Sequence, residues 1–472
     1  MKIAFIFGKG IDGCGVTRGA VFYEKWLRER GHTSIIVDFD NGQSFGRAKE
    51  VDWLGDMYEV RKKDTKVPAE VINAVNSCDI AIFHSHPTRK QGDYTDRYRE
   101  FVSAIDQPIV VMHDHSIAKT NINAIPQACE LFAMADVAVI QSLDGYSKEA
   151  YTSFDPGLSN HLIENPIWID PRKYDAYRKP FAKRDKHLLY MGRMSPLKDP
   201  AMICRIQPHM GIDWDLSIIG CENSISSVSN YTGDLSDNPA PYIPEWRGMI
   251  RQHSLNKHGE YVATEKEQAK DWRIKSYDKY RYDWGMNQLG SSFASWCGYK
   301  LSDASEYGYR MEYTMIESYL LTLPVINRHF AENARSPEGK LWGEYDCALV
   351  SQAREEEVLA DELERLQNNE KEWNDRTAAC RDLITKFNDI DIIGQQFLDR
   401  VLANGKRSDK VNGLDRICEY FPSARERRAR GEVIMSSASG TLNRTPMVMI
   451  NGKQEIVKEK PVTVTSLEDF FV

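Results

Sequence analysis

The sequence predicts an α/β protein with two doubly wound domains, each a parallel sheet covered by helices. Three observations support this prediction. The chain has 472 residues, more than a single hydrophobic core usually organises. Its short apolar runs are nearly continuous rather than alternating, which is typical of strands buried on both faces of a parallel sheet. Segments with helical periodicity separate these runs, in the order of repeated strand–helix–strand units.

Residues 1–168 form the first predicted domain. The apolar run Lys2–Phe7 predicts its first strand, and Thr17 is expected to cap a helix that ends at Arg30-Gly31, where glycine is the favoured residue. Four further runs predict strands: Ser34–Val37, Asp79–His84, Ile109–Met112 and Val137–Ile140. Strands and helices that alternate in this way favour a Rossmann-like arrangement.

A polar, basic stretch, Pro171–Lys186, is interpreted as a linker to a second α/β domain over residues 186–385. Four runs predict its strands: His187–Met191, Asp215–Ile219, Leu323–Ile326 and Ala348–Val350. Residues 221–300, rich in aromatic and charged side chains, are interpreted as an insertion into this domain. A helical segment at 386–404 is expected to close the body of the protein, and residues 405–472 to form a polar, mobile tail.

Composition excludes several classes of protein. Hydrophobic residues make up 42% and charged residues 28% of the chain, as in ordinary globular enzymes. No apolar run approaches the ~18 residues of a membrane span, and the N-terminus lacks the pattern of a secretion signal. The nine cysteines form no C-x-x-C pair, so we expect reduced thiols and a cytoplasmic location. The net charge of −8 predicts that any contact with nucleic acid comes from local basic patches.

The first strand is followed by a glycine-rich loop. Three glycines match the G-x-G-x-x-G spacing of dinucleotide-binding proteins: Gly8, Gly10 and Gly13. Asp38 ends the second strand, where such proteins place a ribose-binding acid. The loop runs on to Gly15, however, and is longer than the tight turn of that motif. Backbone amides of Gly15 and Val16 at the helix N-terminus are therefore expected to hold an anion such as a diphosphate, the alternative being a turn without a ligand.

Two motifs in the second half indicate a nucleotide diphosphate. After the strand that ends at Gly192, Arg193 and Lys198 can converge on one diphosphate, unless they are solvated surface cations. Further on, the amides near Thr314 lie at a predicted helix N-terminus that suits a phosphate or a sugar. Glu317, about one turn into that helix, can accept hydrogen bonds from a ribose diol, unless it is an ordinary exposed acid.

His113, Asp114 and His115 follow the predicted strand Ile109–Met112. They are therefore expected at the carboxyl edge of the first sheet, where open α/β folds bind ligands. A carboxylate beside an imidazole can orient or deprotonate an acceptor hydroxyl, which makes His113 and Asp114 the candidate catalytic residues. H-x-H can also bind a metal, but no third ligand is evident, so no metal site is predicted. The remaining alternative is a structural role.

The spacing of these motifs resembles a known enzyme family. G-R-x4-K, followed by a helix with E-x6-P-V-I, is similar to the donor half of retaining glycosyltransferases with the GT-B fold. The resemblance implies that Arg193 and Lys198 bind the donor diphosphate and that Glu317 binds the ribose, in a cleft between two Rossmann-like domains. Pro324 also matches the family. Tyr309 departs from the pattern, because many members carry a glutamate there.

A closer resemblance is to the DNA α-glucosyltransferases of T-even bacteriophages. Four runs support it: Gly13–Thr17, His113–Ser116, Gly298–Ser302, and Glu312–Thr314 with Glu317. The similarity covers most of residues 1–400. It implies retaining transfer of a sugar, glucose or a pentose such as arabinose, from a UDP-sugar to 5-hydroxymethylcytosine in duplex DNA. It also implies that Tyr313 and Thr314 contact the donor, that residues 1–168 face the acceptor, and that neither a cofactor nor a divalent metal is needed.

Contacts with DNA need local cations, because the phosphates carry the charge of the duplex. Four residues are the candidates: His115, Lys275, Lys279 and Arg281. The last three lie among aromatic residues, including Tyr277 and Trp284, on which an extruded base can stack. For each cation taken singly, the alternative is an ordinary solvated surface.

The polar tail ends in apolar residues. Leu467, Phe470 and Phe471 have the i, i+3, i+4 spacing of one helical face. The segment resembles the peptides with which replication proteins bind ring-shaped sliding clamps. That resemblance implies a phage clamp as partner and the cytoplasm of an infected bacterium as the location. The alternative is that this end folds back onto an apolar patch of the enzyme itself.

Two other functions stay open at this point. The first is a GT-B glycosyltransferase that acts on a polysaccharide, a lipid or a small metabolite. The second is a nicotinamide-dependent oxidoreductase that uses the glycine-rich loop and Asp38, which leaves Arg193, Lys198 and Glu317 unexplained. Salt-sensitive binding to DNA argues against the first function, and protection by UDP rather than NAD argues against the second.

Overall fold

A computed structural model of the chain describes residues 1–7, 15–39, 56–61, 64, 66–85, 100–114, 125–140, 148, 151–152, 155–192, 202–220, 250–255, 260–263, 274–277, 282–297, 313–327, 336, 338–345, 356–410, 433–434, 447–450 and 453–456. The chain divides into two compact units: unit 1, residues 1–168 with 390–472, and unit 2, residues 169–389. The first and last residues of unit 2 lie side by side, because the Ile169 amide donates to the Asn388 carbonyl at 2.8 Å.

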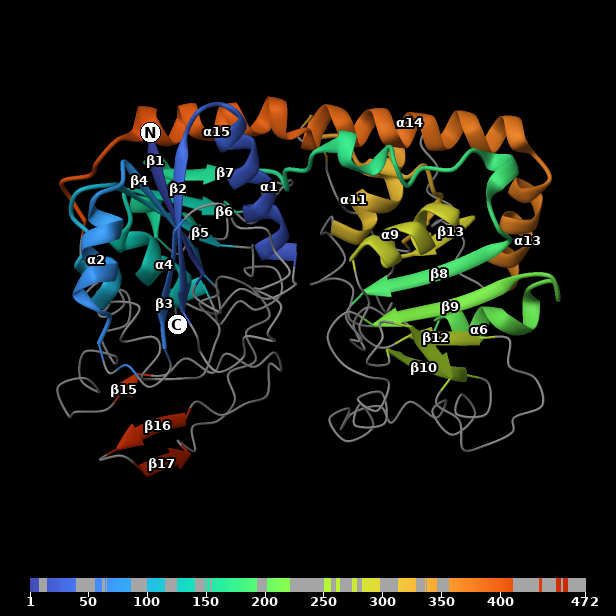
Figure 1. Ribbon diagram of the computed structural model, residues 1–472, viewed down its shortest axis with the longest axis horizontal. Helices are drawn as coiled ribbons and strands as arrows, with labels where there is room; N and C mark the ends of the chain where they lie inside the picture. The colour runs from blue at the N-terminus through green and yellow to red at the C-terminus, as the bar shows by residue number, and fades with distance from the viewer. Residues whose placement is uncertain are drawn as a thin grey trace. The chain divides into compact units, whose positions relative to one another are not determined.

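Unit 1 is built on a seven-stranded sheet in the order β3-β2-β1-β4-β5-β6-β7 (Figure 1). Its strands are β1 (Lys2–Phe7), β2 (Thr33–Phe39), β3 (Asp56–Val60), β4 (Ile80–Ser85), β5 (Ile109–Asp114), β6 (Val137–Ile140) and β7 (Leu162–Glu164). Every neighbouring pair is parallel, as the continuous apolar runs predict. Strand β3 lacks such a run, because it is a polar, largely exposed edge strand.

Helices α1 (Gly15–Glu29), α2 (Ala69–Asn76), α4 (Ile125–Met134) and α15 (Ile390–Asn404) accompany this sheet. The prediction that Thr17 caps α1 is wrong, because the helix already begins at Gly15 and Thr17 lies inside its first turn. The predicted C-terminal end of α1, at Arg30-Gly31, is confirmed. Gly31 has a φ of 80°, a left-handed conformation that favours glycine, and its amide donates to the Arg28 carbonyl at 2.9 Å.

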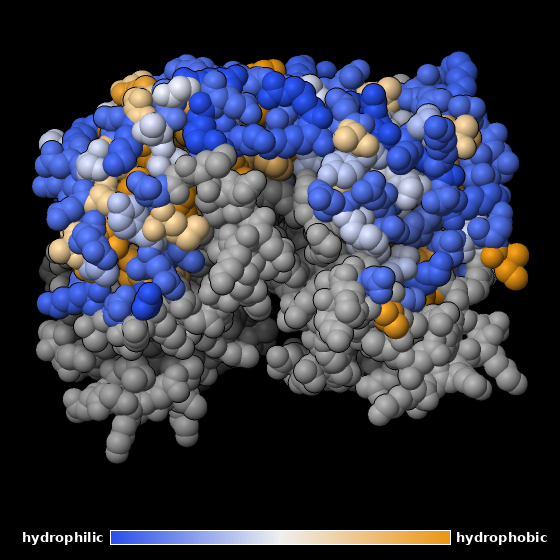
Figure 2. Space-filling model, viewed as in Figure 1, coloured by the Kyte–Doolittle hydropathy of each residue, from blue (hydrophilic) through white to orange (hydrophobic). Residues whose placement is uncertain are grey.

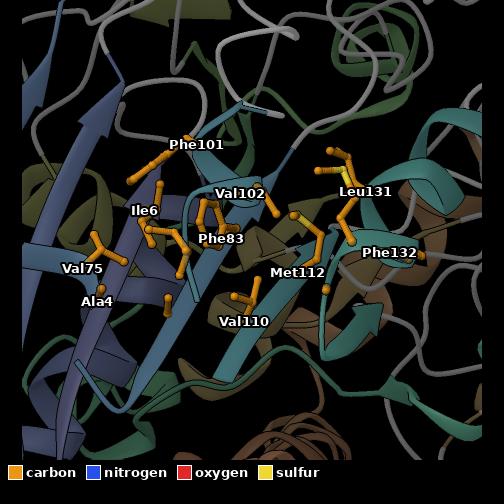
Figure 3. Packing of buried hydrophobic residues seen from close by; sticks show 14 of the residues in the cluster. Ala4, Ile6, Val75, Phe83, Phe101, Val102, Val110, Met112, Leu131 and Phe132 are labelled. Atoms are coloured by element: carbon orange, nitrogen blue, oxygen red, sulfur yellow. The ribbon is translucent and has the colours of Figure 1, made fainter. Parts of the chain in front are cut away.

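The core of unit 1 lies on both faces of its sheet. On one face, side chains of β1, β4 and β5 pack against those of α2, α4 and residues 100–103; they include Ala4, Ile6, Val75, Phe83, Phe101, Met112 and Phe132 (Figure 3). On the other face, α15 packs beside α1. The Tyr23 hydroxyl donates to the Gly394 carbonyl at 3.2 Å, and the Trp26 indole donates to Asp391 at 2.9 Å. The last helix of the body therefore belongs to the N-terminal unit.

Unit 2 is built on a second seven-stranded sheet in the order β11-β10-β12-β9-β8-β13-β14. Its strands are β8 (His187–Gly192), β9 (Asp215–Gly220), β10 (Ile250–Leu255), β11 (Tyr261–Ala263), β12 (Ile274–Tyr277), β13 (Ala294–Trp296) and β14 (Val325–Ile326). All neighbouring strands are parallel except β10 and β11. The predicted strand Ala348–Val350 lies outside the described residues.

The prediction that residues 221–300 are an insertion is wrong for the part that the structure describes. Strands β10, β11, β12 and β13 from this segment belong to the central sheet of unit 2. Strand β12 shows why the sequence misleads. Ile274 and Ser276 are buried and alternate with the half-buried Lys275 and Tyr277, so the strand has no continuous apolar run.

Helices α6 (Met202–Ile206), α9 (Tyr282–Ser291), α11 (Tyr313–Leu320), α13 (Glu356–Gln367) and α14 (Glu370–Asn388) accompany this sheet. The predicted linker is part of unit 2. Its two 3-10 turns, Pro171–Tyr174 and Phe181–Lys183, pack onto α11 and α14, and Tyr177 between them contacts α9. At one contact a Cβ on Gly290 would come within 2.1 Å of the Tyr177 carbonyl oxygen, so only glycine fits in α9 there. Hydrophilic side chains cover α14 on the face seen in Figure 2.

We expect unit 2 to lose stability as the pH falls below about 6.5. His187, the first residue of β8, is buried, and its Nδ1 lies 2.9 Å from the Ser292 hydroxyl. Burial lowers the pKa of His187 from 6.5 to about 4. Because the pKa of His187 is higher in the unfolded chain, its imidazole is protonated in the unfolded state and neutral in the folded state between pH 4 and pH 6.5. The stabilisation is therefore complete above pH 6.5 and is lost towards pH 4.

From this pKa shift, we expect the unfolding free energy of unit 2 to be about 2 kcal/mol lower at pH 5 than at pH 7. Urea unfolding of the wild type and of His187→Gln at both pH values measures this difference. We expect a flatter pH dependence in the variant. Equal pH dependence in the two proteins would contradict the assignment.

Part of the predicted tail beyond α15 is described by the structure. The Arg407 amide donates to Asp136 at 2.8 Å, and its guanidinium donates to the Ala135 carbonyl at 3.0 Å, so this segment packs on unit 1. Further on, β15 (Val433–Ile434), β16 (Met447–Ile450) and β17 (Lys453–Ile456) form an antiparallel sheet. The mobility expected for this tail stays a prediction.

The Asn-Gly pair between β16 and β17 in the sequence is the local signal for such a hairpin, because it favours two-residue turns. None of the helices in the described part of the chain combines the length and the hydropathy that crossing a lipid bilayer requires.

Candidate functional site

In unit 2, three strands end at one edge of the sheet. Strands β8, β13 and β14 are parallel and in register, with Trp296 beside both Tyr190 and Ile326. Strand β8 lies between β9, the next strand in the chain, and β13, a later strand. The order in which the strands are added to the sheet therefore reverses at β8. Open α/β sheets bind ligands at such points. Arg193 and Lys198, the predicted diphosphate ligands, follow the end of β8 in the sequence and lie outside the described residues.

Helix α11 begins at the same edge. Only a short turn separates its end at Leu320 from the start of β14, so the helix runs back along the sheet and its N-terminus faces the carboxyl ends of the strands. Tyr313 and Thr314, both predicted donor ligands, are its first two residues. Their backbone amides belong to the first turn, where a helix has no internal partners for its N–H groups. Phosphates bind at this kind of helix terminus.

Glu317 lies in the middle of α11 and is completely buried. Burial excludes the alternative that it is an ordinary exposed acid. The hydroxyl of Tyr174, which is also completely buried, donates to Glu317 Oε1 at 3.2 Å. A glutamate is rarely buried without a hydrogen-bonding partner, since removing a carboxylate from water is costly. This Tyr174–Glu317 pair is invisible in the sequence, because Tyr174 lies in the stretch interpreted as a linker.

Hydrogen bonds fix α11 to its surroundings. The Ser295 hydroxyl of β13 donates to the Ser318 hydroxyl at 2.9 Å, which in turn donates to the Thr314 carbonyl at 2.7 Å. The half-buried guanidinium of Arg184 donates to the Leu321 carbonyl at 2.5 Å, at the other end of the helix. Burial lowers the pKa of Arg184 to about 9, which leaves it charged at neutral pH. Its charge therefore complements the negative C-terminal end of the helix dipole.

Unit 1 has a corresponding edge at the ends of β4 and β5. His84 and His113 lie opposite each other in the parallel register, and their rings are 5.3 Å apart. His113 is buried, with its ring 5.6 Å from that of Trp168. It lies within β5 rather than beyond it, since the strand extends to Asp114. The predicted contact of His113 and Asp114 with the substrate stays a prediction.

His84 is a candidate residue that the sequence reasoning missed. Its ring is buried and stacks on that of Phe7 from β1, 5.2 Å away. A signal does exist in the sequence, because residues 84–86 repeat the H-x-H pattern of residues 113–115 at the end of a second apolar run. The strand register places the first histidine of each pattern side by side. His115 and His86 lie outside the described residues.

The predicted anion site falls at the N-terminus of α1, although that helix begins two residues before the predicted cap, Thr17. Gly15 and Val16 are the first two residues of the helix that follows β1, and β1 lies between β2 and β4, at the winding reversal of the first sheet. Their amides are therefore placed as an anion site requires. Asp38, the ribose ligand of the oxidoreductase alternative, is the buried penultimate residue of β2.

The predicted DNA-binding residues fall into two groups. Lys275 lies near the amino end of β12, and its Nζ is 3.0 Å from Asp215 Oδ1. At the carboxyl end of the same strand, the Tyr277 ring stacks on His253 at 4.9 Å and lies 5.0 Å from Trp284. The aromatic residues therefore lie at the ligand-binding edge, and Lys275 lies toward the opposite edge. Lys279 and Arg281 are outside the described residues.

The predicted clamp-binding residues Leu467, Phe470 and Phe471 also lie outside the described residues. In the part of the chain that the structure does describe, no three His, Cys, Asp or Glu side chains are grouped so that they could hold a metal ion.

Comparison with known proteins gives one curated relative. Over 121 residues the chain is 28% identical to the DNA alpha-glucosyltransferase of Enterobacteria phage T4. The aligned region covers 25% of this chain and only 30% of that relative. No family model matches the chain.

The fold is similar to solved structures over 85% of the chain. One is alpha-glucosyltransferase in complex with UDP (TM-score 0.65, 17% identity). Another is alpha-glucosyltransferase in complex with UDP and a 13-mer DNA that contains a mismatch (TM-score 0.64, 15% identity). The similarity extends over the full length of both of these structures. HepE of Anabaena in complex with UDP-glucose is also covered completely (TM-score 0.57, 13% identity). The predicted GT-B fold is confirmed, and the chain resembles the phage T4 DNA alpha-glucosyltransferase in a quarter of its sequence and in its fold.

Proposed function

We propose that the chain is a glycosyltransferase that moves a sugar from a UDP-sugar to 5-hydroxymethylcytosine in duplex DNA. One observation supports this proposal above the others. The N-terminus of α11 lies at the carboxyl edge of the second sheet, the edge where the G-R-x4-K loop begins, and the buried Glu317 lies about one turn into that helix. The similar solved structures contain UDP, UDP-glucose and DNA, which supports both the donor and the acceptor.

In this proposal Arg193 and Lys198 neutralise the donor diphosphate, the amides of Tyr313 and Thr314 bind a phosphate or the sugar, and Glu317 binds the ribose diol. The acceptor hydroxyl oxygen forms a bond to C1 of the sugar while the bond from C1 to the β-phosphate oxygen breaks. UDP leaves, and one of its phosphate oxygens takes the acceptor proton. Charge develops on the diphosphate during this step, so fixed cations beside it lower the barrier.

The amides of Gly15 and Val16 also bind the donor, as an anion site at the N-terminus of α1. On the acceptor side, Asp114 and His113 orient the hydroxymethyl group. His115, Lys279 and Arg281 contact DNA phosphates. Lys275 contributes less, because Asp215 already neutralises it. The proposal that transfer needs no cofactor or divalent metal rests on the family resemblance, as does retention. The transferred sugar is glucose or a pentose such as arabinose.

A second candidate is a GT-B enzyme with a different acceptor. The similarity to HepE favours it, because the same fold occurs there with UDP-glucose bound. A fold shared by many glycosyltransferases does not define the acceptor. The two candidates differ in DNA binding, which depends steeply on salt when cations contact phosphates.

Mass spectrometry of DNA nucleosides decides between them. We expect hydroxymethylated duplex DNA, incubated with the protein and a panel of UDP-hexoses and UDP-pentoses, to gain one sugar per modified cytosine with one donor. A duplex of the same sequence with unmodified cytosine is the control and should gain none. UDP binding without transfer to either duplex would favour the second candidate. Absence of UDP binding would contradict both.

A further inference from the structure

The turn that carries Tyr174 is firmly held. Asp170 caps it by accepting a hydrogen bond from the Arg172 amide at 3.1 Å, and the preceding residue, Ile169, is bonded through its amide to Asn388. Proline at the first position of the turn, Pro171, restricts its backbone further. The Tyr174 ring is therefore presented to α11 from a backbone with little freedom, so its hydroxyl has a defined position next to Glu317.

Helix α11 is held independently of that hydroxyl. Arg184 and Arg381 donate to the carbonyls of Leu321 and Leu320 at its C-terminal end. Arg184 also donates to the hydroxyl of Thr322 at 2.8 Å, and this residue has a left-handed φ of 58°, which is unfavourable for a β-branched side chain. These contacts locate the helix, so the contact with Tyr174 chiefly concerns the Glu317 side chain.

We propose that Tyr174 is a positioning residue that orients the Glu317 carboxylate for the ribose of the nucleotide. The two side chains are joined by a hydrogen bond of 3.2 Å between completely buried groups. A glutamate side chain has three rotatable bonds, and a hydrogen bond from a fixed donor to Oε1 restricts them, so the carboxylate is held in one orientation. The inference rests on the proposed function, which assigns Glu317 to the ribose.

The test is Tyr174→Phe, which removes one oxygen and keeps the ring. We expect KM for the UDP-sugar, and Kd for UDP measured by calorimetry, to rise about tenfold with kcat nearly unchanged, because ribose contacts are made equally in the ground and transition states. Tyr177→Phe is the matched control. Tyr177 lies in the same segment, and its hydroxyl donates to Asp283 at 2.7 Å, away from α11. The Tyr177→Phe variant should leave Kd for UDP unchanged.

A double-variant cycle shows whether the effect passes through Glu317. We expect Tyr174→Phe combined with Glu317→Gln to bind UDP no more weakly than Glu317→Gln alone. We also expect Tyr174→Phe to weaken binding of 2′-deoxy-UDP less than that of UDP, since part of the diol is missing. A purely structural role would weaken both nucleotides equally.

The outcomes separate this inference from the proposed function. If the wild type binds no UDP, the proposed function fails, and the inference fails with it. If the wild type binds UDP and Glu317→Gln weakens binding while Tyr174→Phe does not, only the inference is overturned. Additive effects in the double variant, or equal effects on UDP and 2′-deoxy-UDP, would overturn it as well. Unfolding midpoints of the single variants show whether each still folds.

Discussion

Replacing Arg193 or Lys198 by alanine is expected to abolish sugar transfer and to leave the fold intact. Both side chains follow the carboxyl end of β8, the central strand at the reversal point of the second sheet. Charge develops on the donor diphosphate as its bond to the sugar breaks, and a missing cation leaves that charge uncompensated. Losing one such group costs roughly 100- to 1,000-fold in rate. Initial rates with saturating donor and hydroxymethylated DNA measure the effect.

Lys183→Ala is the matched control, because this exposed lysine lies in the same unit outside the predicted site. It should retain the wild-type rate, and all three variants should keep the wild-type unfolding midpoint. Near-normal rates for Arg193→Ala and Lys198→Ala with every UDP-sugar would contradict the donor assignment.

Changes at Asp114 and His113 are expected to reduce transfer and leave UDP binding largely intact. Both residues lie at the end of β5 in unit 1, whereas the predicted nucleotide ligands Arg193, Lys198 and Glu317 belong to unit 2. A group that orients or deprotonates the acceptor contributes roughly 100- to 10,000-fold to the rate. We expect a loss of this size for Asp114→Asn, measured as kcat, with an unchanged Kd for UDP by calorimetry.

The burial of His113 calls for two substitutions. His113→Ala removes a ring that packs against Trp168 and His84, so it opens a cavity and lowers stability. His113→Phe keeps a ring in that space and removes only the imidazole chemistry. If transfer is lost in both, the imidazole is required. If His113→Phe transfers at the wild-type rate, the residue has a structural role, and lost UDP affinity with unimpaired transfer would contradict the acceptor assignment altogether.

The sequence by itself determined the fold class and most of the first sheet. Continuous apolar runs such as Lys2–Phe7 and Val137–Ile140 occur where a strand is buried on both faces. The burial of these strands can therefore be predicted from the local sequence. The sequence also located the edge at which the donor site is predicted. Strand β8 ends at Gly192, and the charged residues that follow it mark the carboxyl edge of a parallel sheet.

The tertiary structure alone decided which polar segments belong to the interior. Strand β12 joins the second sheet although its residues alternate in burial, because its neighbours β9 and β10 supply the hydrogen bonds. Helix α15 packs on the N-terminal unit although it follows the C-terminal one in the chain. No local pattern records such pairings, since they depend on partners far away in the sequence.

The Tyr174–Glu317 pair depends on tertiary structure in the same way. Tyr174 lies 143 residues before its partner, in a stretch whose charges resemble those of a solvated linker. Composition describes the average environment of a segment, and most residues of this stretch are indeed exposed or half-buried. Tyr174 faces inward because a 3-10 turn packs onto α11, and the sequence holds no periodicity that shows this.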